Sequence, residues 1–203
     1  MSRKKCLIML YDKDIREPLL DYMEERYGKV RIIEEKQIGR SRADIVMVLP
    51  GGIAGIEIKS DADTYARLDR QVKDYDLYFD RNYVVIGSTH ALHAAEHVPG
   101  YWGIISVEWL DDKVDFYMVR EAADNPKMDL RRKIQILWRP ELAHIQEMYG
   151  MPKYAGKSKE FVRNKIVDRI PEELLQKQIS EELFERDYTR IGETIWRYKK
   201  LGR

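Results

Sequence analysis

Two apolar segments separated by a Pro-Gly-Gly turn constrain the fold of this chain more than any other feature. They lie between Arg42 and Lys59, in the sequence RADIVMVLPGGIAGIEIK. Apolar runs of this length around a Gly/Pro turn predict the two strands of a hairpin. Charged residues interrupt the pattern at Asp44, at the start of the first strand, and at Glu57 and Lys59, at the end of the second. Charges on buried strands are costly unless they pair or bind a ligand.

The chemistry of these three charged groups predicts a hydrolytic site. Side chains alternate across a strand, so Glu57 and Lys59 share one face and Ile58 points to the other. Carboxylate oxygens bind Mg²⁺, and a nearby lysine can orient or deprotonate a water molecule. The alternative is a surface hairpin whose charges face water, because Glu-x-Lys is a weak signal in a chain with 35% charged residues.

The hairpin and the segment after it resemble the PD-(D/E)XK nuclease superfamily, whose signature is an acid on one strand and Asp/Glu-x-Lys on the next. The following sequence, DTYARLDRQVKDYDLYF, places Gln71 and Tyr75 four residues apart, on one face of an expected helix. A Gln-x-x-x-Tyr helix at this point resembles the RecB-like branch of the superfamily. The likeness covers roughly residues 12–110, and Ala43 stands where the superfamily often has proline.

This resemblance implies a Mg²⁺-dependent (or Mn²⁺-dependent) nuclease that hydrolyses phosphodiester bonds of DNA. Asp44 and Glu57 would hold the metal ion together with the backbone carbonyl of Ile58. Lys59 would orient the attacking water, and Gln71 would contact the substrate or a water at the site. The alternative is a catalytically inactive protein with the same fold that binds DNA or a partner protein.

Several neighbouring charges are further candidates for the site. Glu34 and Glu35 lie on the strand before Asp44, and alternation places only one of them on the site face. We take Glu34 as the additional catalytic acid. Glu17 on the first helix is another option. Arg40 and Arg42 are expected to contact phosphate. Solvated charges and ion pairs with the surplus carboxylates are the alternatives.

The order of the expected elements predicts an α/β domain over residues 1–120. A helix after an N-cap at Asp14 is followed by a strand, the hairpin, a helix over about 63–79, and alternating strands and helices that end near Val119. This order fits the small mixed central sheet, flanked by helices, of the restriction-endonuclease-like fold.

Residues 121–203 are expected to form an all-helical extension. The segment over about 139–170 resembles a SAP-like motif, a pair of short helices around a loop that usually binds DNA; Lys157 and Lys159 flank the loop and are its candidate phosphate contacts. The distribution of charge supports the division into these two parts. Residues 1–119 carry 17 Lys/Arg against 21 Asp/Glu, whereas residues 120–203 carry 19 Lys/Arg against 14 Asp/Glu.

Composition indicates a folded protein of the cytoplasm. The single cysteine, Cys6, excludes an internal disulfide, and no apolar run has the length of a membrane span. The pattern leaves open whether cleavage is endonucleolytic or exonucleolytic, whether the substrate is DNA or RNA, and the oligomeric state. Many proteins with this fold pair to cut both strands, so the resemblance is compatible with a homodimer.

Overall fold

The computed structural model describes residues 9–87 and 91–186 of the 203-residue chain. Contacts divide them into a unit that contains the sheet, ending at Met128, and a helical unit that begins at Asp129. The first unit comprises α1 (Asp12–Tyr27), β1 (Arg31–Ile38), β2 (Ser41–Leu49), β3 (Gly52–Lys59), the 3-10 turn η1 (Tyr65–Arg67), α2 (Leu68–Tyr78), β4 (Arg81–Gly87), α3 (Ala91–His97), β5 (Gly103–Leu110) and β6 (Lys113–Arg120). The second comprises α4 (Leu130–Lys133), the 3-10 turn η2 (Ile134–Ile136), α5 (Arg139–Met148), α6 (Lys159–Arg169) and α7 (Glu172–Phe184).

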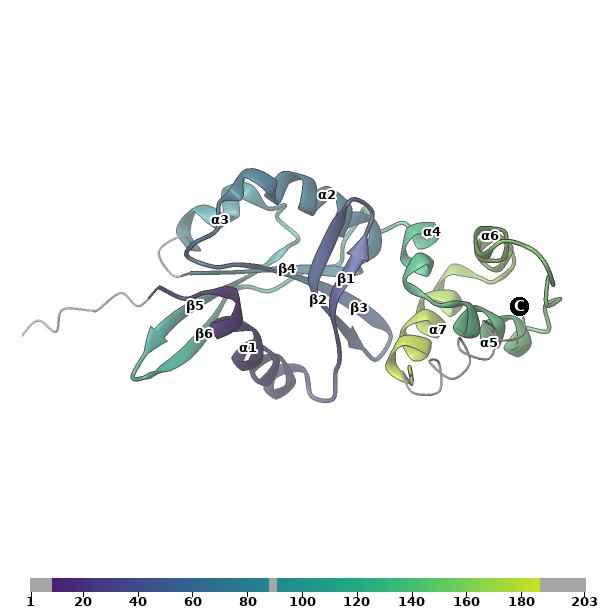
Figure 1. The fold of residues 1–203 in the computed structure, drawn as a ribbon, viewed down its shortest axis with the longest axis horizontal. Coiled ribbons are helices and arrows are strands. Elements are labelled where there is room, and N and C mark those ends of the chain that lie inside the picture. The colour runs from purple at the N-terminus through teal and green to yellow at the C-terminus, as the bar shows by residue number, and fades with distance from the viewer. Residues whose placement is uncertain (1–8, 88–90, 187–203) are drawn as a thin grey trace, which may run out of the picture. The chain divides into compact units, whose positions relative to one another are not determined.

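The six strands form one mixed sheet in the order β1-β2-β3-β4-β5-β6. The pairs β1/β2 and β5/β6 are antiparallel, whereas β3/β4 and β4/β5 are parallel. Helix α1 lies on one face of the sheet, and α2 and α3, which connect the parallel strands, lie on the other (Figure 1). The predicted mixed α/β architecture with C-terminal helices is therefore confirmed.

Helix α1 begins earlier than the sequence pattern predicts. The helix starts at Asp12 after an N-cap at Tyr11, and the Asp14 carboxylate accepts a hydrogen bond from the Tyr11 backbone N–H at 3.1 Å. Asp14 therefore caps the helix from its third position and is not the N-cap. A buried stripe of Ile15, Leu19 and Met23 packs against the sheet, as helical spacing requires.

The opposite face of the sheet is covered by α2, which approaches β3 closely at Gly55. A Cβ atom at Gly55 would lie 2.2 Å from the Phe79 ring and 2.7 Å from the Tyr75 ring. Residue 55 therefore has to be glycine for these two aromatic rings to rest on the strand. Tyr75 and Phe79 also contact each other, with ring centroids 5.3 Å apart. This packing fixes α2 directly over the end of β3 that carries Glu57 and Lys59.

The polar segment after β6, which the sequence suggests as a linker, is tied to the sheet unit. Asn125 donates hydrogen bonds from Nδ2 to the backbone carbonyls of Asp76 and Phe79, each at 2.8 Å. The backbone N–H of Ala123 donates to the carbonyl of Tyr101 at 2.9 Å. These bonds explain why the division between the units falls after Met128 and not at residue 120.

The helical unit has its own core and a buried ion pair. The Arg186 guanidinium is fully buried, donates to both carboxylate oxygens of Glu141 at 2.6 and 2.9 Å, and lies 4.4 Å from the centre of the Trp138 ring. Glu141 also accepts from the Trp138 backbone N–H and so caps α5. None of the helices in the described part of the chain is long and apolar enough to cross a membrane.

Candidate functional site

The site is built where β2 and β3 lie side by side. The backbone N–H of Ile58 on β3 donates a 2.8 Å hydrogen bond to Oδ2 of Asp44 on β2. Residues 45, 56 and 58 belong to the core cluster on the α1 face, so alternation directs Asp44 and Glu57 to the face that α2 covers. The two carboxylates that the sequence singles out therefore occupy the same face of neighbouring strands.

Glu57 and Lys59 form a buried ion pair beside α2. Lys59 Nζ lies 2.6 Å from Glu57 Oε1, with 9% and 2% of the two side chains exposed. Gln71 on α2 closes a triangle: its Oε1 accepts from Lys59 Nζ at 2.9 Å, and its amide nitrogen donates to Glu57 Oε1. The structure thus brings Glu57, Lys59 and Gln71 together, because residue 71 falls on the helix face turned toward β3.

Tyr75 joins the two carboxylate-bearing strands from one helical turn further along α2. Its hydroxyl lies 2.7 Å from Glu57 Oε2 and accepts a hydrogen bond from the Asp44 backbone N–H at 3.2 Å. The ring is completely buried and contacts Trp102, with centroids 5.5 Å apart. One side chain therefore both packs in the core and holds the site. Burial is also the main reason that the pKa of the Tyr75 phenol is raised well above its ordinary value of 10.0.

Asp44 resists ionisation in this position. Burial and then the neighbouring Glu57 charge raise the pKa of Asp44 from 3.8 to about 7, and the Ile58 N–H partly offsets this. The Asp12 carboxylate also raises the pKa of Asp44. Sequence reasoning missed Asp12, because only the packing of α1 brings this residue near Asp44.

Arg16, which the sequence analysis also missed, connects α1 to the strands around Asp44. Its guanidinium donates to Asp12 (2.9 Å), to Glu34 (3.3 Å) and to Glu35 (2.9 Å). A further bond of 3.1 Å reaches the backbone carbonyl of Asp44. Arg16 thereby compensates the negative charge of three carboxylates and holds the backbone of β2 at Asp44 in place.

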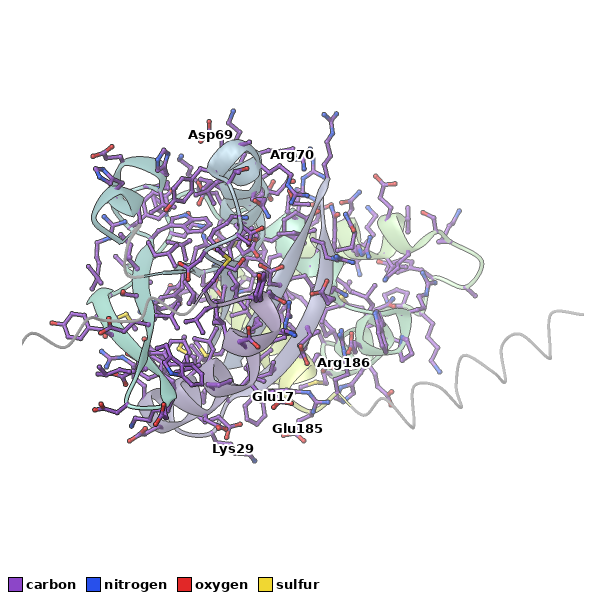
Figure 2. All side chains as sticks on the ribbon, turned by 60° about the vertical axis from the view of Figure 1, so that its left-hand side comes forward. Glu17, Lys29, Asp69, Arg70, Glu185 and Arg186 are labelled. Carbon is purple, nitrogen blue, oxygen red and sulfur yellow. The ribbon has the colours of Figure 1, made fainter. Side chains whose placement is uncertain are left out.

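The remaining sequence candidates around the hairpin lie outside this triangle. Glu34 is directly opposite Ile45 in the β1/β2 register, so it points to the α1 face, where Arg16 binds it. Arg42 is exposed and pairs with Glu35 at 2.6 Å. Arg40 is exposed on the β1–β2 turn, and Glu17 is exposed on α1 (Figure 2).

One of the two candidate lysines of the helical unit, Lys157, lies over an aromatic ring, as does Lys165. Lys157 Nζ and Lys165 Nζ lie 5.6 and 5.7 Å from the centre of the Phe161 ring. Ser158 caps α6 by accepting the Phe161 backbone N–H at 3.1 Å, and Lys159 is the first residue of that helix. Helices α5 and α6 flank the connecting segment, in which Lys157 is exposed.

Asp44 and Glu57 are the residues that would hold a divalent ion. Residues 9–87 and 91–186 contain no group of three or more His, Cys, Asp or Glu side chains arranged to hold a metal, so an ion here would be held by the two carboxylates and a backbone carbonyl such as that of Ile58. The Glu57 carboxylate accepts three hydrogen bonds and retains one acceptor position. Among the described residues none donates to Asp44 Oδ1. A half-buried and a buried acid on neighbouring strands, one with a pKa of about 7, are what a cation would stabilise.

Comparisons with known proteins identify the family to which the chain belongs. The family model described as bacteriophage P4 protein cII matches residues 8–201. Protein cII of Enterobacteria phage P4 is 21% identical over 147 residues, which is 70% of this chain and 55% of the phage protein, so the chain spans about half of the length of that relative. A solved structure, Pyrococcus furiosus SfsA in complex with Ca²⁺, is similar with a TM-score of 0.38 and 15% identity over 58% of this chain and 68% of the other, too weak a likeness to carry an argument. The matching family is described by the phage protein and not as a PD-(D/E)XK family. The chain belongs to the bacteriophage P4 protein cII family.

Proposed function

We propose that the protein is a metal-dependent nuclease that hydrolyses phosphodiester bonds of DNA. Its catalytic site would consist of Asp44, Glu57 and Lys59. The observation that carries the proposal is the convergence of these groups with Gln71 on one face of neighbouring strands. Mere binding of a nucleic acid does not require a buried carboxylate–ammonium pair with a second, half-buried carboxylate on the neighbouring strand.

Each residue has a role that follows from its contacts. Mg²⁺ held by Asp44 and Glu57 would supply Lewis-acid stabilisation of the negative charge that develops on the phosphoryl oxygens. Lys59 has three N–H donors and uses two of them on Glu57 and Gln71, so one remains to orient a water or a phosphate oxygen. Gln71 and Tyr75 hold Glu57 in place, and Ile58 orients Asp44 through its N–H.

The second candidate function is DNA or partner binding without turnover. One observation favours it: both oxygens of Glu57 are already hydrogen-bonded within the protein, so its negative charge is compensated without a metal ion. The match to the phage family, whose description names no enzymatic activity, also supports this candidate.

A cleavage assay separates the two functions. Purified protein is incubated with linear, circular and single-stranded DNA in Mg²⁺, Mn²⁺ or EDTA, beside a Lys59→Met variant and an exposed control, Lys113→Met. The nuclease proposal expects cleavage that needs the metal, disappears in Lys59→Met and persists in Lys113→Met. DNA that is bound but intact in every metal condition would favour the non-catalytic function. Equal cleavage by wild type and Lys59→Met would remove this site from the reaction.

A further inference from the structure

The outer face of α2 carries a row of cations that the candidate site does not use. Arg67, the N-cap of α2, and Arg70 and Lys73 on the helix itself are exposed and recur every third residue, so successive members lie about 4.5 Å apart along the helix axis. In the part of the chain that the structure describes, no carboxylate lies within ion-pair distance of any of the three. We name these residues the α2 basic track.

Acidic residues on the same helix offset this charge only in part. Asp74 accepts a 2.6 Å hydrogen bond from the Ser41 hydroxyl, and Asp76 is buried, where it accepts bonds from Tyr101 and Trp102. Asp69 is the exposed acid of α2, beside Arg70 (Figure 2). Arg67, Arg70 and Lys73 therefore exceed the exposed Asp69 and the half-buried Asp74 by one charge, in a unit that is acidic as a whole.

The track begins next to the candidate site, because Arg67 precedes Gln71 by four residues and so lies on the same side of the helix. Gln71 in turn contacts Glu57 and Lys59. The bond from Ser41 to Asp74 also holds the β1–β2 turn against α2, which brings the exposed Arg40 alongside. A chain of phosphates that crosses the site would run over this helix face.

We infer that the α2 basic track is the surface that holds the phosphate backbone of a nucleic acid beside the site. This inference rests on the proposed function and adds to it the element that binds the substrate. Guanidinium and ammonium groups recognise phosphates irrespective of base sequence, so the track favours binding without sequence preference.

Binding in EDTA tests the track without any need for cleavage. Fluorescence anisotropy of a labelled DNA duplex, and of the same single strand, is measured over a salt series for the Arg67→Ala/Arg70→Ala/Lys73→Ala variant. A matched control, Lys13→Ala/Arg81→Ala/Lys113→Ala, removes the same charge from exposed positions on other elements. We expect the track variant to bind more weakly by on the order of tenfold or more at low salt and to lose about 2 to 3 from its salt slope. The control should stay within about twofold of wild type.

Two results overturn the inference: the same loss in both variants, or unchanged binding by the track variant. A wild-type protein that binds neither form of DNA overturns it as well. Failure of the proposed function gives a different pattern, in which the track variant loses affinity as expected but wild type cleaves no DNA in Mg²⁺ or Mn²⁺.

Discussion

Glu57 and Lys59 form a buried ion pair, 2.6 Å long, on the face of β3 that α2 covers. Because the pair is buried, removal of one partner leaves the other as an uncompensated charge, which destabilises the protein. The same two side chains are therefore important both for stability and for the proposed reaction.

A double-mutant cycle separates these two contributions. We expect Lys59→Met to destabilise the protein by about 3 to 5 kcal/mol, because Glu57 is left buried and unpaired. Glu57→Gln/Lys59→Met should recover most of that stability and remain without cleavage activity. Urea unfolding and a DNA cleavage assay on Glu57→Gln, Lys59→Met and the double variant measure both effects. Activity that returns together with stability would show that Lys59 acts only as a structural cation.

The pH dependence of stability should report the protonation of Asp44. Its pKa in the folded protein, about 7, lies above its ordinary value of 3.8, so between these values the folded protein keeps a proton that the unfolded chain has lost. The stability that this proton confers is complete below about pH 4 and is lost as the pH rises to about 7.

Urea unfolding in EDTA at about pH 5 and about pH 8 checks this expectation. The free energy of unfolding should fall by on the order of 2 kcal/mol more in wild type than in Asp44→Asn, which cannot titrate. Asp69→Asn, at an exposed position of α2, is the control and should behave as wild type. Parallel pH profiles of wild type and Asp44→Asn would contradict the assignment.

The approach of α2 to β3 should depend on the absence of a side chain at residue 55. Gly55→Ala places a Cβ within 2.7 Å of both Tyr75 and Phe79 and should destabilise the protein by about 1 to 3 kcal/mol. Gly100→Ala, with nothing within 4 Å of the new Cβ, is the matched control. Thermal unfolding of the two variants gives the comparison, and equal melting temperatures would refute the packing argument.

The basic loop of the helical unit makes a separate prediction. Lys157→Ala/Lys159→Ala should weaken DNA binding and reduce the salt slope by about 2, because each lysine is expected to displace one counterion from the phosphates. Anisotropy in EDTA measures this slope. An unchanged slope would remove the loop from the DNA contacts.

The sequence predicts those parts of the protein that depend on local pattern. The apolar runs around Pro50 and the alternation at residues 57–59 suffice for the two strands and for the shared face of Glu57 and Lys59. The four-residue spacing of Gln71 and Tyr75 likewise predicts one helix face, and both side chains bond to Glu57.

Contacts between distant segments could not be predicted in this way. Arg16 and Asp12 act on Asp44 across 28 and more residues of sequence, and only the packing of α1 brings them there. The orientation of the Glu34 side chain depends on the β1/β2 register. This register places Glu34 opposite Ile45 and so on the other face of the sheet. One residue of register decides which face an alternating strand presents, and the sequence does not specify it at a polar edge strand.

The most direct test of the site is a crystal structure of the protein soaked in Mn²⁺, with the anomalous signal of the ion as the readout. We expect one peak bound by the carboxylates of Asp44 and Glu57, and no peak there in Asp44→Asn crystals grown and soaked in the same way. An active protein whose Mn²⁺ lies elsewhere, or whose Asp44 and Glu57 bind none at saturating concentration, would contradict it.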